Sequence, residues 1–264
     1  MGIMDFGGKM NITENKKSIP RFLTGNMIKI IAAVLMVIDH IGSVLMQPGG
    51  ILRILGRISM PLFAFMIAEG AKYTKNKVKY LGMIAGLATA CQLVYYFALK
   101  DTYMCILVTF SLSITLIYAL DFVKWAYLSG EGNSRAKVVS PLLFIALTLL
   151  AYYLTTVLRI DYGFFGIMMP VFASITDMRG YDIPENIRWI ESHYVRVLMM
   201  AIPMLIRMIN HEPIMWYSLL ALPILLLYSE KRGKWKMKYF FYVFYPVHLG
   251  LIYIIVILVY LLSR

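Results

Sequence analysis

Residues 27–46 read MIKIIAAVLMVIDHIGSVLM, and this stretch decides the fold class. About 20 mostly apolar residues make a helix long enough to cross the hydrocarbon core of a bilayer. The whole chain shares this character, since 60% of its 264 residues are hydrophobic and 15% are charged, against about 45–50% and about 25% in soluble domains. Too few polar residues remain to cover a soluble globule, so the composition predicts a polytopic membrane protein.

Eight further segments pass the same test of length and apolarity. The predicted membrane helices cover residues 27–46, 54–72, 80–99, 104–123, 138–158, 162–177, 196–209, 214–229 and 239–262. The sequence thus predicts an all-α bundle of about nine transmembrane helices, with eight or ten left open because the sixth and seventh are short. We expect residues 1–26 to form a polar cytoplasmic segment and residues 27–264 to form one transmembrane domain. Residues 178–195 predict an amphipathic helix at the membrane surface.

Lysine and arginine residues predict the orientation, because they are retained on the cytoplasmic side of short loops. With the N-terminus inside, the cytoplasmic segments hold 19 of the 26 basic residues: Lys9, Lys16, Lys17, Arg21, Lys72, Lys75, Lys77, Lys79, Lys124, Arg135, Lys137, Arg179, Arg188, Arg196, Lys231, Arg232, Lys234, Lys236 and Lys238. The outer segments hold five: Arg53, Lys100, Arg159, Arg207 and Arg264. A cytoplasmic N-terminus follows, and topology accounts for the net charge of +12 without a nucleic-acid partner.

Few charges lie within the predicted spans, where each costs about 2.5–3.5 kcal/mol near the bilayer centre. Lys29 and His40 are eleven residues apart in the first span, which places them on one helix face about 16 Å apart. Asp39 adjoins His40, and antiparallel packing of the second span brings Arg53 and Arg57 to the same depth. We expect an Asp39–Arg57 ion pair and a polar cavity beneath the outer surface that is reachable from inside.

Four motifs resemble the TraX family: the Asp39–His40 pair closing the first span, LRILGRISMPLFAF at 52–65, DYGFFG at 161–166 and FYPVH at 244–248. The resemblance covers about residues 24–260, and the family is associated with N-terminal acetylation of conjugative pilin. A weaker similarity joins the chain to the acyltransferase-3 superfamily, whose first span carries Arg or Lys, ten residues and then His. Lys29 and His40 keep that spacing.

The resemblance implies a multi-pass acyltransferase of the bacterial cytoplasmic membrane. It would take an acetyl or other acyl group from cytoplasmic acyl-CoA, with acetyl-CoA as the expected donor, and pass it to a protein or glycan acceptor such as a pilin N-terminus. His40, with Asp39 beside it, is the implied catalytic residue. Imidazole is chemically suited to this role because it can take a proton from an attacking amine or hydroxyl.

Two sets of binding residues are expected around His40. The donor set is Lys29, Arg53, Arg57, Glu69 and Lys72, and the substrate set is Asp161, Tyr162, Gly163, Arg207, Tyr245 and His248. Lys75, Lys77 and Lys79 also suit nucleotide phosphates, although positive-inside bias explains them equally. Structural roles stay open for several of these residues: Lys29 reaching lipid headgroups, Glu69 pairing with Lys29 or Lys72, the arginines pairing with Asp39 or Asp161, and His248 packing at the Pro246 kink.

Two other function classes would use similar residues. A proton-coupled transporter or flippase would also place Asp39, His40 and Arg57 in the bilayer, although no paired repeats are visible. A non-catalytic scaffold would explain the aromatic content but not the buried charges. No metal is expected, because Cys91 and Cys105 lie in apolar surroundings without a ligand pattern.

Overall fold

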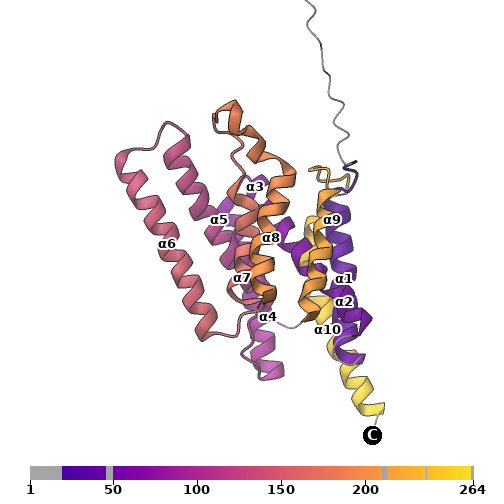
Figure 1. The fold of residues 1–264 in the computed structure, drawn as a ribbon. Coiled ribbons are helices and arrows are strands. Elements are labelled where there is room, and N and C mark those ends of the chain that lie inside the picture. Colours follow the sequence, from indigo (N-terminus) through magenta and orange to yellow (C-terminus); the bar gives the residue numbers. More distant parts are fainter. Residues whose placement is uncertain (1–19, 46–49, 210–212, 236, 263–264) are drawn as a thin grey trace, which may run out of the picture.

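The computed structural model describes residues 20–45, 50–209, 213–235 and 237–262, and within these ranges the regular structure is helical (Figure 1). The α-helices are α1 (Gly25–Leu45), α2 (Ile51–Gly56), α3 (Ser59–Tyr73), α4 (Lys77–Val94), α5 (Ile106–Leu128), α6 (Ser134–Val157), α7 (Gly163–Ile175), α8 (His193–Ile209), α9 (Ala221–Leu226) and α10 (Lys238–Leu262). A π-helical turn, η1 (Tyr95–Leu99), and two 3-10 helices, η2 (Glu185–Glu191) and η3 (Pro213–Leu220), complete the set. The predicted all-α fold is confirmed.

Each of the nine predicted segments coincides with one helix or with two consecutive helices. The second segment is broken between α2 and α3, and the eighth is shared by η3 and α9. Among the described residues, five helices are long and apolar enough to cross a membrane, or six if η2 and α8 form one bent span. The structure therefore supports a membrane bundle, while the count of nine and the cytoplasmic N-terminus stay predictions.

The amphipathic helix predicted over residues 178–195 is replaced by a turn and a short 3-10 helix. Gly180 has a φ of +92°, a left-handed conformation that interrupts a right-handed helix. Pro184 has no N–H to donate and precedes η2. The chain then bends by 58° between η2 and α8. The apolar residues that suggested one helix therefore belong to these two separate elements.

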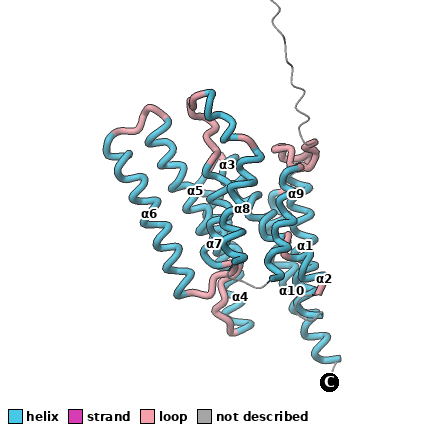
Figure 2. The backbone as a smooth tube through the Cα atoms, viewed as in Figure 1, coloured by secondary structure: helices cyan, strands magenta, loops and turns pink. Residues whose placement is uncertain are grey.

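The connections between helices gather at two ends of the bundle (Figure 2). We call the end that carries Lys72, Lys75 and Arg232 the basic end. There, Leu23 bridges to Tyr228, and Lys72 pairs with Asp177 at 2.9 Å. At the opposite end, Met104 bridges to the residue before Asp161 in the α6–α7 connection. Described connections that were predicted to be cytoplasmic thus lie at the basic end, and the predicted outer connections α4–α5 and α6–α7 lie at the opposite end (Figure 2).

Helix α3 lies inside the bundle, whereas α6 lies at its edge (Figure 1). In the span Ile51–Tyr73, 61% of the most apolar window is buried, against 11% for the span formed by α6. Buried charge is therefore concentrated on α3 and on the elements around it, where protein and not lipid surrounds the side chains. Asn76 and Asn133 begin α4 and α6 by accepting hydrogen bonds from the backbone N–H groups of Lys79 and Ala136.

Candidate active site

Asp39 of α1 is held by two arginines. Nη2 of Arg57 lies 2.5 Å from both carboxylate oxygens of Asp39, and Nη1 of Arg53 lies 3.0 Å from Oδ1. The Nε of Arg57 also donates to the Arg53 carbonyl at 3.3 Å, and Arg57 is only 7% exposed. The predicted Asp39–Arg57 pair is confirmed, and two arginines on one carboxylate leave this cluster with a net positive charge.

Gly56 permits this pairing because it lies directly against Asp39. A Cβ atom at position 56 would overlap the Asp39 side chain. The chain turns immediately after Gly56, at Arg57, so α2 ends and α3 begins with Ser59. The Ser59 hydroxyl donates to the Ala32 carbonyl of α1 at 2.7 Å and fixes the turn against that helix.

We expect Gly56→Ala to lower the stability of the detergent-solubilised protein by about 1–3 kcal/mol, because the added methyl group overpacks the Asp39 cluster. Gly82→Ala in α4 is the matched control, since a Cβ there meets no atom within 4 Å. Alanine also favours a helix over glycine by about 0.5–1 kcal/mol, so Gly82→Ala should be neutral or stabilising. Thermal unfolding compares the two variants, and equal melting temperatures would contradict the close contact with Asp39.

A hydrogen bond within α1 determines which ring nitrogen of His40 carries the proton. Nδ1 lies 2.7 Å from the Met36 carbonyl oxygen, four residues earlier. A carbonyl oxygen only accepts hydrogen bonds, so Nδ1 of neutral His40 carries the proton and Nε2 keeps a lone pair. A neutral imidazole with a free lone pair is the state that a general base requires.

A second histidine lies against the first. The rings of His40 and His248 are edge to face with centroids 5.3 Å apart, although one belongs to α1 and the other to α10. Nδ1 of His248 lies 3.0 Å from the Phe244 carbonyl, and the two rings of that pair are stacked at 5.0 Å. Its Nε2 is buried without a hydrogen-bond partner in the described part of the chain. His248 therefore adds a second imidazole lone pair beside His40.

Further polar side chains reach the same region from the connections around α5 and α7. The Tyr103 hydroxyl donates to Oδ1 of Asp161, and Arg207 of α8 donates to the Tyr162 carbonyl and lies 4.8 Å from the centre of the Tyr162 ring. Burial raises the pKa of the Asp161 carboxyl, while the Tyr103 hydrogen bond and the positive charge of Arg207 oppose the rise. The three predicted residues Asp161, Tyr162 and Arg207 thus meet in space.

Tyr103 is a site residue that the sequence analysis missed. It contacts Asp161 from 58 positions earlier in the chain, a separation that no local pattern reports. Its place just before the fourth predicted span, at the depth expected for Asp161, was the one available signal.

A separate charge cluster lies toward the basic end. Nη2 of Arg196 is 2.6 Å from Oε1 of Glu69, and the Tyr228 hydroxyl donates to Oε2 of Glu69 at 2.9 Å. Arg196 is 1% exposed and Glu69 is 4% exposed, so this pair is almost completely buried. Lys72 pairs with Asp177 at 2.9 Å, so Lys72, one of the two partners left open for Glu69, is engaged elsewhere. Helix α8 brings Arg196 to Glu69, and the sequence analysis had placed Arg196 only among the loop charges.

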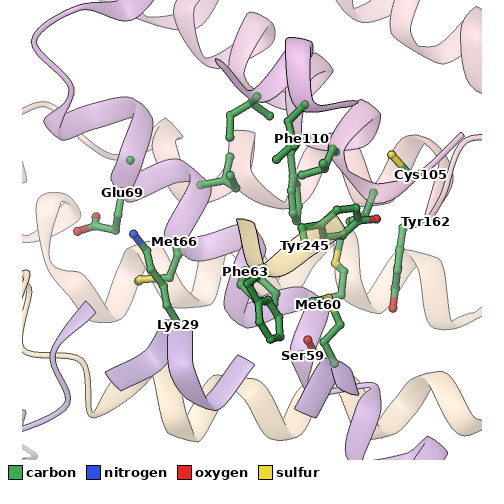
Figure 3. A pocket seen from close by; sticks show the side chains of 18 of the residues that line it. Lys29, Ser59, Met60, Phe63, Met66, Glu69, Cys105, Phe110, Tyr162 and Tyr245 are labelled. Atoms are coloured by element: carbon green, nitrogen blue, oxygen red, sulfur yellow. The ribbon is translucent and has the colours of Figure 1, made fainter. Parts of the chain in front are cut away.

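One cavity of about 1100 Å³ is lined by residues of both clusters, among them Asp39, Arg57 and Glu69. Figure 3 shows Lys29 and Glu69 on one side of it and Cys105, Tyr162 and Tyr245 on the other. Between them the wall is largely apolar and rich in methionine: Met36, Met60, Phe63, Met66, Ile67, Met83, Ile84, Leu87 and Phe110. The cavity also reaches Lys75 and Arg232 at the basic end and Asp39, His40 and Arg207 at the opposite end.

Most of the predicted site residues line this cavity. They are Lys29, Asp39, His40, Arg53, Arg57, Glu69, Asp161, Tyr162, Arg207 and Tyr245. Three others are not among the lining residues: Lys72 pairs with Asp177, Gly163 begins α7 with a φ of +58°, and the His248 ring lies edge to face against the His40 ring. Among the described residues, no group of three or more histidine, cysteine and carboxylate side chains has the arrangement of a metal site.

Comparison with known proteins identifies the family. The sequence model described as TraX protein matches residues 24–256, which is most of the chain. This protein belongs to the TraX family. The TraX match includes all ten predicted residues that line the cavity, as well as His248 on α10.

A curated relative of this TraX family member is the probable fimbrial assembly protein FimC, serogroup H1, of Dichelobacter nodosus. The two sequences are 25% identical over 242 residues, which cover 85% of this chain and 92% of the relative. No solved structure matches the chain. The name of the relative concerns fimbrial assembly. The resemblance to TraX found in the four sequence motifs is confirmed.

Proposed function

We propose that this protein is a membrane-embedded acyltransferase that moves an acetyl or other acyl group from acyl-CoA to an amine or hydroxyl of an acceptor at the other end of the cavity. The observation that carries the proposal is the single cavity, which is lined by basic residues at one end and by His40 at the other. It offers a thioester a continuous route between the two ends. The apolar middle section suits the pantetheine arm better than it suits a charged solute.

The proposed reaction uses the free Nε2 of His40 as the base. The acceptor nitrogen or oxygen attacks the thioester carbonyl, and Nε2 takes the proton that the acceptor loses. The tetrahedral intermediate then collapses, the C–S bond breaks, and CoA leaves as its thiolate while an amide or ester forms. Arg53 and Arg57 together outweigh the single charge of Asp39, so their field favours the negative oxygen of the intermediate.

A protein subunit of a fimbria or pilus is the acceptor class that the comparison supports. The relative named for fimbrial assembly aligns over almost its whole length with this chain. An exposed N-terminal amine of such a subunit is a small group that the polar end of the cavity would admit. A hydroxyl of an envelope glycan has the same reactivity toward a thioester and is the other acceptor to be tested.

Labelled acetyl-CoA tests this proposal directly. The purified protein in lipid nanodiscs is mixed with radiolabelled acetyl-CoA and envelope fractions, and mass spectrometry identifies the acetylated product. We expect covalent label in a protein or glycan, formed only when the membrane protein is added. Label that stays in acetyl-CoA with every acceptor fraction would overturn the proposal.

A proton-coupled transporter or flippase is the second candidate, because the cavity has polar residues at both ends. Such a protein would move a solute or lipid across vesicles without changing it covalently. Solute uptake or lipid exchange in proteoliposomes, without a covalent product, would favour this reading over acyl transfer.

A further inference from the structure

The sequence places four lysines close together, and the structure separates them into two pairs. Lys72 forms an ion pair with Asp177 at 2.9 Å, and Lys77 forms one with Asp121 at 2.6 Å. Neither of these lysines lines the cavity. Lys75 and Lys79 do line it, and no ion pair joins either of them to a carboxylate of the described residues.

The local structure explains this division. The Asn76 side chain accepts a hydrogen bond from the Lys79 backbone N–H at 2.8 Å and so fixes the first turn of α4. Residues two positions apart on an α-helix point about 200° apart, so Lys77 and Lys79 face opposite sides. Lys77 turns toward Asp121 of α5, and Lys79 turns toward the mouth of the cavity.

Arg232 adds a third cation to the mouth from the connection between α9 and α10. It lines the cavity, and no carboxylate of the described residues pairs with it. The two carboxylates at the mouth are already engaged, since Glu69 pairs with Arg196, and Glu230 pairs with Arg21 at 3.1 Å. The mouth therefore carries an excess of positive charge that the protein itself does not neutralise.

We propose that Lys75, Lys79 and Arg232 bind the phosphates of the acyl-CoA nucleotide at the mouth of the cavity. This inference rests on the proposed function, because it assigns the nucleotide end of the same donor. Lysine and arginine bind phosphate through charge-assisted hydrogen bonds. The pantetheine arm then extends between the methionine-rich walls toward His40, along the roughly 16 Å that separates Lys29 from His40 on α1. Phosphates of lipid headgroups share this chemistry, and the experiment below distinguishes a headgroup from CoA at these cavity-lining cations.

Binding measurements on the full-length protein test the assignment. CoA binding is measured by calorimetry in nanodiscs for the wild type, for Lys75→Ala with Lys79→Ala, for Arg232→Ala, and for Lys77→Ala as the control from the same segment. We expect Lys75→Ala with Lys79→Ala, and separately Arg232→Ala, to weaken CoA binding about tenfold or more. The Lys77→Ala protein should bind CoA like the wild type. Binding of acetyl-pantetheine, which has no nucleotide phosphates, should be the same in all four proteins.

The outcomes separate this inference from the proposed function. Unchanged CoA binding in Lys75→Ala with Lys79→Ala and in Arg232→Ala, or no CoA binding by the wild type, would overturn the phosphate site. Loss of copurified anionic phospholipid with unchanged CoA binding would also overturn it, in favour of a headgroup site. CoA binding that depends on these residues, in a protein that transfers no acetyl group, would leave the phosphate site standing and would refute the acyltransferase proposal.

Discussion

His40→Ala should lower the rate of acetyl transfer by about 10²–10⁴-fold, the usual contribution of a general base. The Met36 carbonyl holds the Nδ1 proton of His40 and leaves Nε2 as the proton acceptor, and alanine removes that nitrogen. The rate is measured with labelled acetyl-CoA and the acceptor identified by mass spectrometry. Because His40 is only partly buried in the cavity wall, the variant should keep its fold and its affinity for CoA.

Two controls make the His40 result specific. Added imidazole should restore part of the activity of His40→Ala, because it can occupy the space of the missing ring and accept the proton. His193→Ala removes another histidine, whose Nε2 donates to the Leu225 carbonyl at 2.7 Å and which does not line the cavity. Added imidazole should not increase the activity of the His193→Ala protein. Acetyl transfer by His40→Ala at the wild-type rate would show that His40 is not the base.

Glu69→Ala should destabilise the protein by about 3–5 kcal/mol, because it leaves the guanidinium of Arg196 buried without its main counter-charge. Arg196 is 1% exposed and lies over the Phe65 ring at 5.2 Å, and its other carboxylate partner, Glu230, is farther away at 3.7 Å. Arg196→Ala should cost a similar amount, since it leaves Glu69 with the Tyr228 hydroxyl and the more distant Arg179 at 4.0 Å. Unfolding in a denaturing detergent series measures the loss.

A double substitution separates pairing from packing at this position. Glu69→Leu combined with Arg196→Met replaces the ion pair by apolar side chains of similar size. We expect the double variant to be more stable than either alanine variant, because no unpaired charge remains buried. Tyr228→Phe should cost about 1 kcal/mol, the value of one hydrogen bond. A Glu69→Ala protein as stable as the wild type would contradict the expected cost of removing this counter-charge of Arg196.

The sequence alone predicted much of the candidate site on α1 to α3. The Asp39–Arg57 pair followed from short-range geometry. Two antiparallel helices joined by a short loop bring residues at the same depth in the membrane next to each other. The Tyr103–Asp161 and Glu69–Arg196 contacts did not follow, because they join residues 58 and 127 positions apart. Helical periodicity fixes which face of a helix a residue occupies, but it does not fix which distant helix lies against that face.

Composition and hydropathy by themselves determined that this chain is an apolar helical bundle and roughly where its long apolar segments lie, because a bilayer requires helices of a given length with satisfied backbone groups. The tertiary structure alone decided which charges are used. It buried Arg196 against Glu69, set His248 beside His40, and divided the four lysines near α4 between ion pairs and the cavity mouth. The physical reason is that a charge is neutralised by whatever group packing brings within a few ångströms, and that distance is a property of the folded chain.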